Sequence, residues 1–324
     1  MSPANIVSTG SAEGPAVKIL ESYGPIAVTP DRTEDTLIAM LTEARGLIVR
    51  GDGADVTARV IDAAPKLEVI GRSGVGYNNV DVEAATARKI PLVFTPGAGA
   101  RAVAESSIAM VLTLCKRLMY WDEQLKSGNW DSRNESHPGD MEGATLGIVG
   151  FGRIGQDLAR LAAPFDMTIL ATDPFVSQQI AEERNTTLVD LDELLTRSDF
   201  ICLHAAAVEG SKGLINRQRL ETVKRGACLI NLARGELVES LDVLHEALLD
   251  GRLAAVGLDV FAPEPPDVRH PIFSLSQCLT APHALGMTPG AMNRIWTSMA
   301  RDMDAVLSGR RPQFVVNEQV LEDS

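Results

Sequence analysis

The sequence predicts an α/β protein with two domains, each built on a doubly wound parallel sheet. The chain has 324 residues, which is more than one typical domain needs. Short apolar runs alternate with helix-like runs along nearly its whole length, a pattern typical of parallel sheets covered on both faces. A glycine-rich turn between a strand and a helix, within residues 145–173, begins a second series of this alternation.

The first series of elements covers about the first hundred residues. Strands are predicted at 5–9, 26–28, 46–49, 67–71 and 91–94, and helices at 15–23, 33–44, 55–63 and 82–89. A helix-length apolar run, 101–120, follows. The next stretch, 121–142, is polar and contains Trp121 and Trp130, so we expect an arm that forms a homodimer contact. The alternative is a surface loop packed on its own subunit.

Residues 145–173, TLGIVGFGRIGQDLARLAAPFDMTILATD, predict a dinucleotide site. Gly150 permits a tight turn, Gly152 lets a pyrophosphate approach the backbone, and Gly155 lets the helix pack closely on the strand. The free N–H groups at the start of the helix face the phosphates. Asp173, after the second strand, is placed to bind both hydroxyls of an adenosine ribose and would repel a 2′-phosphate. These features predict NAD rather than NADP.

The alternation resumes after residue 173. Helices are predicted at 191–197, 217–223 and 237–250, and strands at 200–204, 227–232, 254–260 and 279–281. A last helix, 288–307, has no strand after it, so we expect it to return and pack on the first domain. The tail, 310–324, can finish there too.

Polar residues that follow strands are the candidate catalytic groups, because open parallel sheets bind ligands at the carboxyl ends of their strands. Arg234 follows one strand, Asp259 ends the next, Glu264 lies in the sequence APEPP, and His283 follows a short strand. A guanidinium suits the carboxylate and carbonyl of a 2-keto acid. An imidazolium can give a proton to the alkoxide that forms, and a neighbouring carboxylate orients the ring. Hence Arg234 orients substrate, His283 transfers the proton, and Glu264 tunes His283.

Composition excludes several other classes. The net charge of −13 disfavours nucleic acid and anionic membranes as partners. No apolar run approaches a membrane span, and the first residues do not resemble a signal peptide, so we expect a cytoplasmic protein. The four cysteines are scattered without metal-ligand spacing, which predicts neither a zinc site nor disulfides. Cys202 and Cys228 lie in strand-like runs and are expected to be buried, inert thiols.

Six stretches together resemble the D-isomer-specific 2-hydroxyacid dehydrogenases over nearly the whole chain. They are GRSGVGYNNVDVEAA (71–85), TPGAGARAVAE (95–105), LGIVGFGRIG (146–155), LINLARGELV (229–238), GLDVFAPEPP (257–266) and TAPHALG (280–286). The resemblance implies a flavodoxin-like substrate domain made from both chain ends, 1–100 and 289–324. It also implies an inserted Rossmann NAD-binding domain, 101–288, and a dimer formed through the arm at 121–142.

The resemblance also implies roles for individual residues. Arg234, Glu264 and His283 match the catalytic residues, in agreement with the interpretation above. The positions that match NAD contacts or belong to the nucleotide turn are Val75, Gly150, Gly152, Arg153, Ile154, Gly155, Asp173, His204, Ala205, Leu232, Asp259 and Gly286. From the residues alone, His204 either faces the cofactor or is packed. The substrate carboxylate is expected on Arg234 and on the backbone of Gly74, Val75 and Gly76.

Within the family the sequence looks most similar to the D-3-phosphoglycerate dehydrogenases. Arg50 and Arg72 match arginines that bind the substrate phosphate there, and Arg133 is a candidate third; the alternative is that they are ordinary surface arginines. These arginines would give an otherwise acidic protein a local positive charge that suits a small anionic hydroxy or keto acid.

Several positions depart from the family pattern. The family often has asparagine where this chain has Phe94 and Gly99, proline where it has Ala206, and a basic residue where it has Gly53. The chain ends at Ser324 without the regulatory domain of many phosphoglycerate dehydrogenases, so serine feedback through such a domain is not expected. Hydroxypyruvate and glyoxylate are therefore alternative substrates. A cofactor-sensing corepressor of the same fold, and a formate- or phosphite-oxidising relative, are the competing functions.

Overall fold

The computed structural model describes residues 5–12 and 14–322. The chain divides into two compact units, the first made of Met1–Gly99 with Thr288–Ser324 and the second of Ala100–Met287. Each unit contains one parallel sheet. The fold class predicted from the sequence, two α/β domains with parallel sheets, is confirmed.

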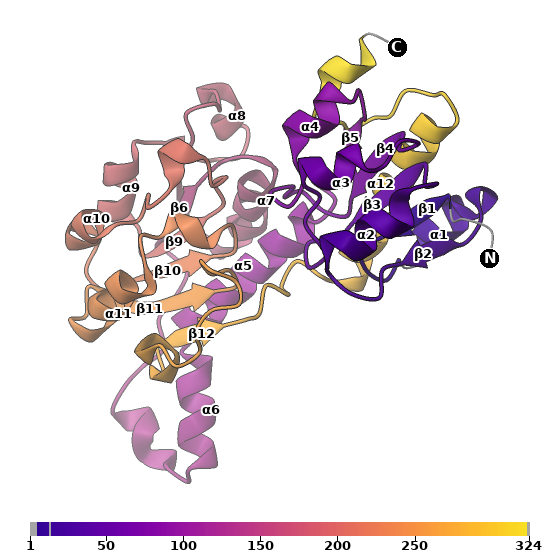
Figure 1. Cartoon of the computed structure of the whole chain (residues 1–324). Helices are drawn as coiled ribbons and strands as arrows, with labels where there is room; N and C mark the ends of the chain where they lie inside the picture. Colours follow the sequence, from indigo (N-terminus) through magenta and orange to yellow (C-terminus); the bar gives the residue numbers. More distant parts are fainter. Residues whose placement is uncertain (1–4, 13, 323–324) are drawn as a thin grey trace. The chain divides into compact units, whose positions relative to one another are not determined.

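The first unit contains a five-stranded sheet in the order β2-β1-β3-β4-β5. Its strands are β1 Ile6–Ser8, β2 Ile26–Val28, β3 Gly46–Val49, β4 Val69–Arg72 and β5 Leu92–Val93. Its helices are α1 Pro15–Ile19, α2 Glu34–Leu41, α3 Ala58–Asp62, α4 Val82–Ala87 and α12 Pro289–Leu307, with 3-10 turns at Glu21–Tyr23 and Glu318–Leu321 (Figure 1). Thr33 and Asp81 begin α2 and α4 by accepting a hydrogen bond from a backbone N–H of the first turn.

Two apolar clusters cover the two faces of this sheet. Side chains of α2, α3 and α4 join one cluster. Those of α1 and α12 join the other, with Trp296, Met299 and Met303 at its centre. A Cβ on Gly71 of β4 would lie 2.3 Å from the sulfur of Met303, so only glycine admits the last helix this close. The last helix therefore packs on the first domain, as predicted.

The second unit contains a seven-stranded sheet in the order β12-β11-β10-β9-β6-β7-β8. Its strands are β6 Thr145–Val149, β7 Thr168–Thr172, β8 Thr187–Leu188, β9 Phe200–Leu203, β10 Ala227–Asn231, β11 Leu253–Leu258 and β12 Cys278–Thr280. Its α-helices are α5 Ala100–Cys115, α6 Leu118–Lys126, α7 Arg153–Ala162, α8 Gln178–Glu182, α9 Leu191–Arg197, α10 Arg217–Thr222 and α11 Leu241–Leu249. Its 3-10 turns lie at Trp130–Asn134, Ala163–Phe165, Glu209–Ser211, Gly235–Leu237 and Pro271–Ser274.

The region of the expected arm differs from the prediction. The predicted helix at 101–120 ends at Cys115, because Arg117 adopts a left-handed backbone with φ of 53° and a new helix, α6, begins after it. The polar stretch 121–142 is thus partly helical, with α6 and a 3-10 turn at Trp130–Asn134. The main contacts of α6 are with α5 and that turn, and none of its residues is buried (Figure 1).

Other helices and strands also differ from their predicted bounds. The helix predicted at 237–250 begins only at Leu241, because Ser240 caps it through the N–H of Val243 and Gly235–Leu237 forms a separate 3-10 turn. The sequence analysis missed α8 and the two-residue strand β8, since both are short and mostly polar.

The apolar interior of the second unit holds the two strand cysteines. Cys202 and Cys228 are buried as predicted, and burial raises the pKa of both thiols, that of Cys228 to about 12. Among the described residues, no group of three or more His, Cys, Asp or Glu side chains could hold a metal ion. Within the same residues, no helix has the length and apolarity to cross a membrane.

Candidate active site

The glycine-rich turn after β6 has the close contacts that a dinucleotide fold requires. Gly150 has a φ of 95°, and a Cβ there would lie 2.5 Å from the backbone nitrogen of Ala205. A Cβ on Gly155 would lie 2.3 Å from the carbonyl oxygen of Gly150. Any larger side chain at either position would force the turn apart from β9 or lift α7 off the sheet.

The start of α7 is open where a phosphate would bind. Gly152 is the N-cap residue, and a Cβ built on it meets none of the described atoms within 4 Å. No side-chain oxygen among the described residues caps this helix. The N–H groups of its first turn and the helix dipole therefore suit a pyrophosphate.

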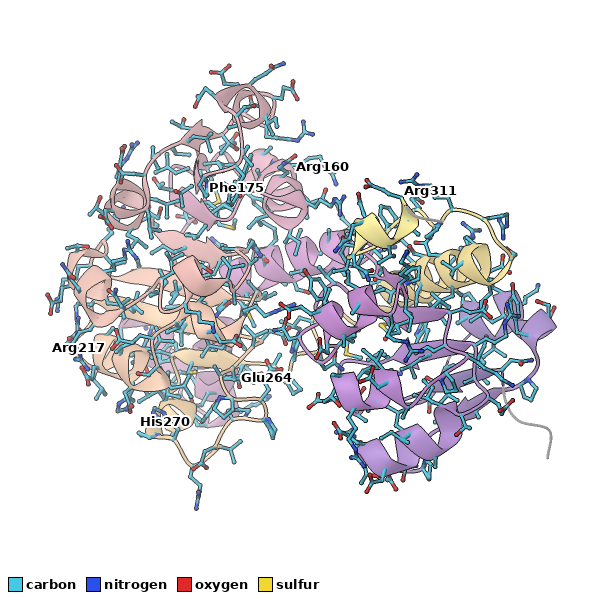
Figure 2. All side chains as sticks on the ribbon, turned by 45° about the horizontal axis from the view of Figure 1, so that its top comes forward. Arg160, Phe175, Arg217, Glu264, His270 and Arg311 are labelled. Atoms are coloured by element: carbon cyan, nitrogen blue, oxygen red, sulfur yellow. The ribbon has the colours of Figure 1, made fainter. Side chains whose placement is uncertain are left out.

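Asp173 is fixed at the end of β7 by two backbone donors. The N–H of Phe151 donates to one carboxylate oxygen at 2.8 Å, and the N–H of Phe175 donates to the other at 2.9 Å. Each oxygen keeps a further lone pair, which suits the two hydroxyls of a ribose. Phe175, which is labelled in Figure 2, donates this second hydrogen bond from its backbone, and its side chain is 95% exposed. The turn, the helix start and Asp173 together fit a dinucleotide.

His204 directly follows β9, beside the same turn. Its Nε2 lies 3.3 Å from the hydroxyl of Ser107 on α5, and its Nδ1 is buried without a hydrogen-bond partner in the described chain. Burial lowers the pKa of His204 to about 4, so the ring is neutral at physiological pH. The structure thus shows a packed, uncharged imidazole, and contact with the cofactor stays a prediction.

Arg234 follows β10 on a loop that a buried asparagine holds. The side-chain amide of Asn231 donates to the carbonyl of Arg234 at 2.9 Å, and its oxygen accepts from the N–H of Ala233 at 3.1 Å. A guanidinium N–H of Arg234 donates to the carbonyl of Ala233. Sequence reasoning missed Asn231. The feature of the sequence that could have indicated it is a single amide side chain at the end of an otherwise apolar strand, CLIN.

The loop of Arg234 lies against the loop that leads to Glu264. A Cβ on Gly235 would lie 2.0 Å from the carbonyl carbon of Phe261, so the two backbones are in direct contact. The N–H of Phe261 in turn donates to Glu264 at 3.0 Å. This contact places two of the three candidate catalytic residues on touching segments.

Glu264 and His283 form the predicted pair. The Nδ1 of His283 lies 2.8 Å from a carboxylate oxygen of Glu264, and both side chains are partly exposed. With Nδ1 engaged, Nε2 is the ring nitrogen left to face a substrate. The structure therefore contains an oriented histidine at the carboxyl edge of the sheet.

The loop of His283 depends on Asp259. His283 has a φ of 54°, an uncommon conformation for a residue with a Cβ, which costs about 1–2 kcal/mol. The buried carboxylate of Asp259 accepts from the next two N–H groups, those of Ala284 at 2.9 Å and Leu285 at 3.2 Å. Burial raises the pKa of Asp259, while these two donors oppose the shift. Asp259 thus holds the loop of His283. Its contact with NAD stays a prediction.

The remaining predicted NAD positions of the second unit lie along its strand ends and turns. Arg153 is exposed on the first turn of α7, whereas Leu232 is buried after β10. Ile154, Ala205 and Gly286 are half-buried.

Apart from Arg234 and Arg133, the predicted substrate residues, Val75 among them, lie in the first unit. Arg50 follows β3 and Arg72 ends β4, again at carboxyl ends of strands. The guanidinium of Arg72 donates to the carbonyl of Ser73, and a Cβ on Gly74 would lie 2.9 Å from it. Arg72 and the loop of Gly74 to Gly76 are therefore neighbours. Arg133 belongs to the second unit, where it stacks 4.8 Å above the ring of Trp130.

These features define a dinucleotide-binding α/β protein with an arginine, a glutamate and a histidine on loops that follow three strands of one sheet. Residues 108–284 match the family model described as the NAD binding domain of D-isomer specific 2-hydroxyacid dehydrogenases. The chain belongs to this family.

Known relatives extend the match to most of the chain. It is 37% identical to a D-3-phosphoglycerate dehydrogenase of Methanocaldococcus jannaschii over 96% of this chain and 59% of that protein. It is 35% identical to a glyoxylate reductase of Thermococcus onnurineus, covering 94% of this chain and 93% of that one. The crystal structure of the TT0316 protein from Thermus thermophilus superposes with a TM-score of 0.86 at 32% identity, covering 96% and 99%. The chain thus spans about three fifths of its phosphoglycerate dehydrogenase relative.

Proposed function

We propose that this protein is an NAD-dependent oxidoreductase that interconverts a small D-2-hydroxy acid and the corresponding 2-keto acid. The observation that carries the proposal is the 2.8 Å contact between His283 and Glu264, on loops that follow β12 and β11. Arg234 follows β10, the next strand of the same sheet. Family membership supports the same chemistry.

Each candidate residue has one task in the reduction of a keto acid. Arg234 binds the carboxylate and polarises the carbonyl, because a guanidinium can donate two parallel hydrogen bonds. His283 donates a proton from Nε2 to the oxygen of the former carbonyl, and takes it back when the hydroxy acid is oxidised. Glu264 keeps the ring oriented through its contact with Nδ1. NAD, when bound, supplies or accepts the hydride.

We assign the cofactor site to the turn after β6. The N–H groups at the start of α7 would hold the pyrophosphate, and Asp173 would bind the adenosine ribose. A carboxylate at this position repels a 2′-phosphate, which supports NAD over NADP. His204 and Ala205 line the opposite side of the turn, where Gly150 approaches them.

The first candidate substrate is 3-phosphoglycerate, with phosphohydroxypyruvate as its keto acid. Arg50 and Arg72 at strand ends of the first unit, and the similarity to phosphoglycerate dehydrogenases, support it. Hydroxypyruvate and glyoxylate are the second candidates. The observation that favours them is that a Cβ on Gly53 would lie 2.0 Å from the hydroxyl oxygen of Thr9, so this position has no room for the basic residue often found there.

The arm is the proposed homodimer contact. Leu118, Leu125 and Trp130 are all more than half exposed on α6 and the following turn. Three large apolar side chains on one projecting segment are typical of an interface. The change Leu125→Glu should convert a dimer, measured by light scattering, into a monomer, whereas Leu249→Glu on the exposed end of α11 should not. A wild-type monomer would contradict the proposal.

The decisive experiment is NADH oxidation by the purified protein with phosphohydroxypyruvate, hydroxypyruvate, glyoxylate and pyruvate. His283→Ala should abolish turnover with each acid. Preference for phosphohydroxypyruvate that collapses in Arg50→Ala supports the phosphoglycerate assignment. Equal or better turnover of the unphosphorylated acids refutes that assignment and leaves the dehydrogenase class standing. No turnover with any acid refutes the class and favours a cofactor sensor or a relative that oxidises formate or phosphite.

A further inference from the structure

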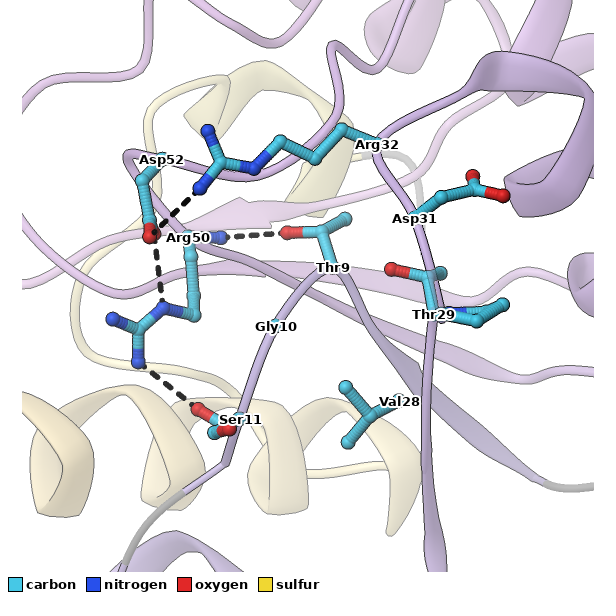
Figure 3. Close-up of a pocket in the computed structure, with 10 residues that line it drawn as sticks. Thr9, Gly10, Ser11, Val28, Thr29, Asp31, Arg32, Arg50 and Asp52 are labelled. Atoms are coloured by element: carbon cyan, nitrogen blue, oxygen red, sulfur yellow. Dashed lines mark hydrogen bonds and ion pairs between the residues drawn. The ribbon is translucent and has the colours of Figure 1, made fainter.

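A pocket of about 360 Å³ lies within the first unit at the carboxyl ends of β1, β2 and β3 (Figure 3). Two arginines face it, Arg50 after β3 and Arg32 on the loop after β2. The volume suits a small ligand. Its lining residues are Thr9, Gly10, Ser11, Val28, Thr29, Pro30, Asp31, Arg32, Arg50 and Asp52.

Arg50 is fixed in the wall of this pocket. Its backbone N–H donates to the hydroxyl of Thr9 at 3.0 Å, and its guanidinium donates to the carbonyl of Ser11 at 3.0 Å. The guanidinium carbon also lies 5.9 Å from the ring centre of Trp296. Its side chain is only 19% exposed, so the charge is partly desolvated and oriented.

Asp52 bridges the two arginines. One carboxylate oxygen accepts from Nε of Arg50 at 3.1 Å, and the other accepts from Nη2 of Arg32 at 3.5 Å (Figure 3). The hydrogen bond from Arg50 holds the pKa of Asp52 below its ordinary value. Asp52 is 60% exposed and Arg32 is 70% exposed, so both can move at little cost. The carboxylate occupies the position that an external oxyanion would need.

The other acidic residue of the pocket has separate partners. One oxygen of Asp31 accepts from the N–H and the hydroxyl of Thr33, and the other accepts from the hydroxyl of Thr36 in the first turn of α2. These bonds lower the pKa of Asp31. Figure 3 shows Asp31 pointing away from the two arginines. Asp31 therefore does not compete for the guanidinium groups.

A hydroxyl donor completes the pocket. Thr29 is 8% exposed, and its oxygen has no hydrogen-bond partner in the described part of the chain. A buried hydroxyl without a partner is unfavourable, and an oxyanion bound in the pocket would supply the missing acceptor. Position 53 cannot supply a further cation, because it is a glycine and Thr9 occupies the space that a side chain there would need.

We propose that this pocket binds a phosphate group between Arg32 and Arg50, with the hydroxyl of Thr29 as a further donor, and that Asp52 is a built-in competitor that the phosphate displaces. The proposal deepens the proposed function and rests on it where the phosphate belongs to the substrate. Arg32 and Asp52 then determine how strongly phosphorylated acids are preferred over unphosphorylated ones. No covalent step is involved.

The test measures inorganic phosphate binding by titration calorimetry on the full chain, so it does not depend on turnover. Arg32→Ala should weaken phosphate binding about tenfold, and Asp52→Asn should strengthen it about threefold to tenfold. Arg59→Ala and Asp35→Asn are matched controls, since this exposed ion pair lies on α3 and α2 outside the pocket lining. The same variants are then assayed with phosphohydroxypyruvate and hydroxypyruvate.

The outcomes separate this proposal from the substrate assignment. A parallel change in the preference for phosphohydroxypyruvate supports a substrate phosphate. Phosphate binding that responds to Arg32→Ala, in a protein without preference for the phosphorylated acid, supports a site for free phosphate and refutes the substrate assignment alone. Unchanged binding and preference in Arg32→Ala, or weakening by Asp52→Asn equal to that by Arg32→Ala, overturns the proposal. Absence of saturable binding and of any phosphate preference overturns it as well.

Discussion

The loops of the second unit and the pocket of the first hold their charged side chains by opposite means. Arg234 and His283 depend on Asn231 and Asp259, two buried residues that bind the backbone of the loops rather than the charged groups themselves. Arg32 and Arg50 are joined by Asp52, an exposed carboxylate bound directly to their guanidinium groups.

This difference separates a fixed site from an exchangeable one. Hydrogen bonds from buried side chains to a backbone orient a catalytic group and leave its reactive atoms open, which preorganises the site. An exposed ion pair contributes little stability and can be replaced by a ligand of the same charge. Four predictions test whether the loops of the second unit behave as a fixed site.

The largest effect is expected at the histidine. The change His283→Asn should lower kcat by about 10³-fold, because it removes the group that transfers the proton. NADH binding, measured by fluorescence titration, should stay within about twofold of wild type. Glu264→Gln should lower kcat less, and Asp242→Asn, in the similar pair with His270 at 3.1 Å, should not lower it. Equal loss in both pairs would mean that a general loss of structure, rather than catalysis, is being measured.

The second prediction concerns stability and pH. His204 stays neutral in the folded chain down to about pH 4, whereas in the unfolded chain it binds a proton near pH 6.5. The unfolded state therefore binds more protons in this range, and the unfolding free energy should fall as the pH falls, by at most about 3 kcal/mol. Denaturant unfolding of the ligand-free protein at several pH values measures this. His204→Gln should remove that share of the slope and His245→Gln should keep it; identical slopes in all three proteins would refute the burial of a neutral ring.

The third prediction concerns the asparagine that holds the arginine. The change Asn231→Asp keeps an acceptor for Ala233 but places a carboxylate against the carbonyl of Arg234. We expect a loss of about 1–3 kcal/mol in unfolding free energy and a decrease of about tenfold in kcat/KM for the keto acid, with NADH affinity unchanged. Asn216→Asp is the control, since aspartate also caps a helix. A stability loss without change in kcat/KM would show that Asn231 does not position Arg234.

The smallest effect is expected at the cofactor carboxylate. The change Asp173→Asn should weaken NADH binding about tenfold and raise the relative use of NADPH, because the charge that repels a 2′-phosphate is removed. Steady-state kinetics with both cofactors measures this. Asp190→Asn, at the N-cap of α9, controls for the loss of one charge in the same unit. An unchanged ratio of the two cofactors would place the adenosine ribose elsewhere.

The strands could be predicted from the sequence because buried parallel strands are short apolar runs. The same pattern indicated which polar residues follow the strands. The contact between Glu264 and His283 was expected on that ground and is present; its catalytic use stays a prediction. The sequence did not reveal the hydrogen bonds of Asn231 and Asp259, because they depend on how neighbouring strands align. The break at Arg117 was also missed, since a left-handed backbone at arginine has no sequence signature.

The predicted phosphate arginines illustrate a further limit. The sequence showed that Gly53 departs from the family pattern, but not that Thr9 fills the space beside it. Arg32 belongs to no recognisable motif, and only folding brings it to Asp52. Contacts between loops that follow neighbouring strands leave no pattern in the local sequence from which they could be predicted.

The two positioning residues of the second unit are themselves joined. The N–H of Asp259 donates to the carbonyl of Asn231 at 3.0 Å, as the next step of the ladder between β11 and β10. A single rung of backbone pairing therefore ties the arginine loop to the histidine loop. Arg32 and Arg50 lie in the other unit, so substitutions around them leave that rung intact.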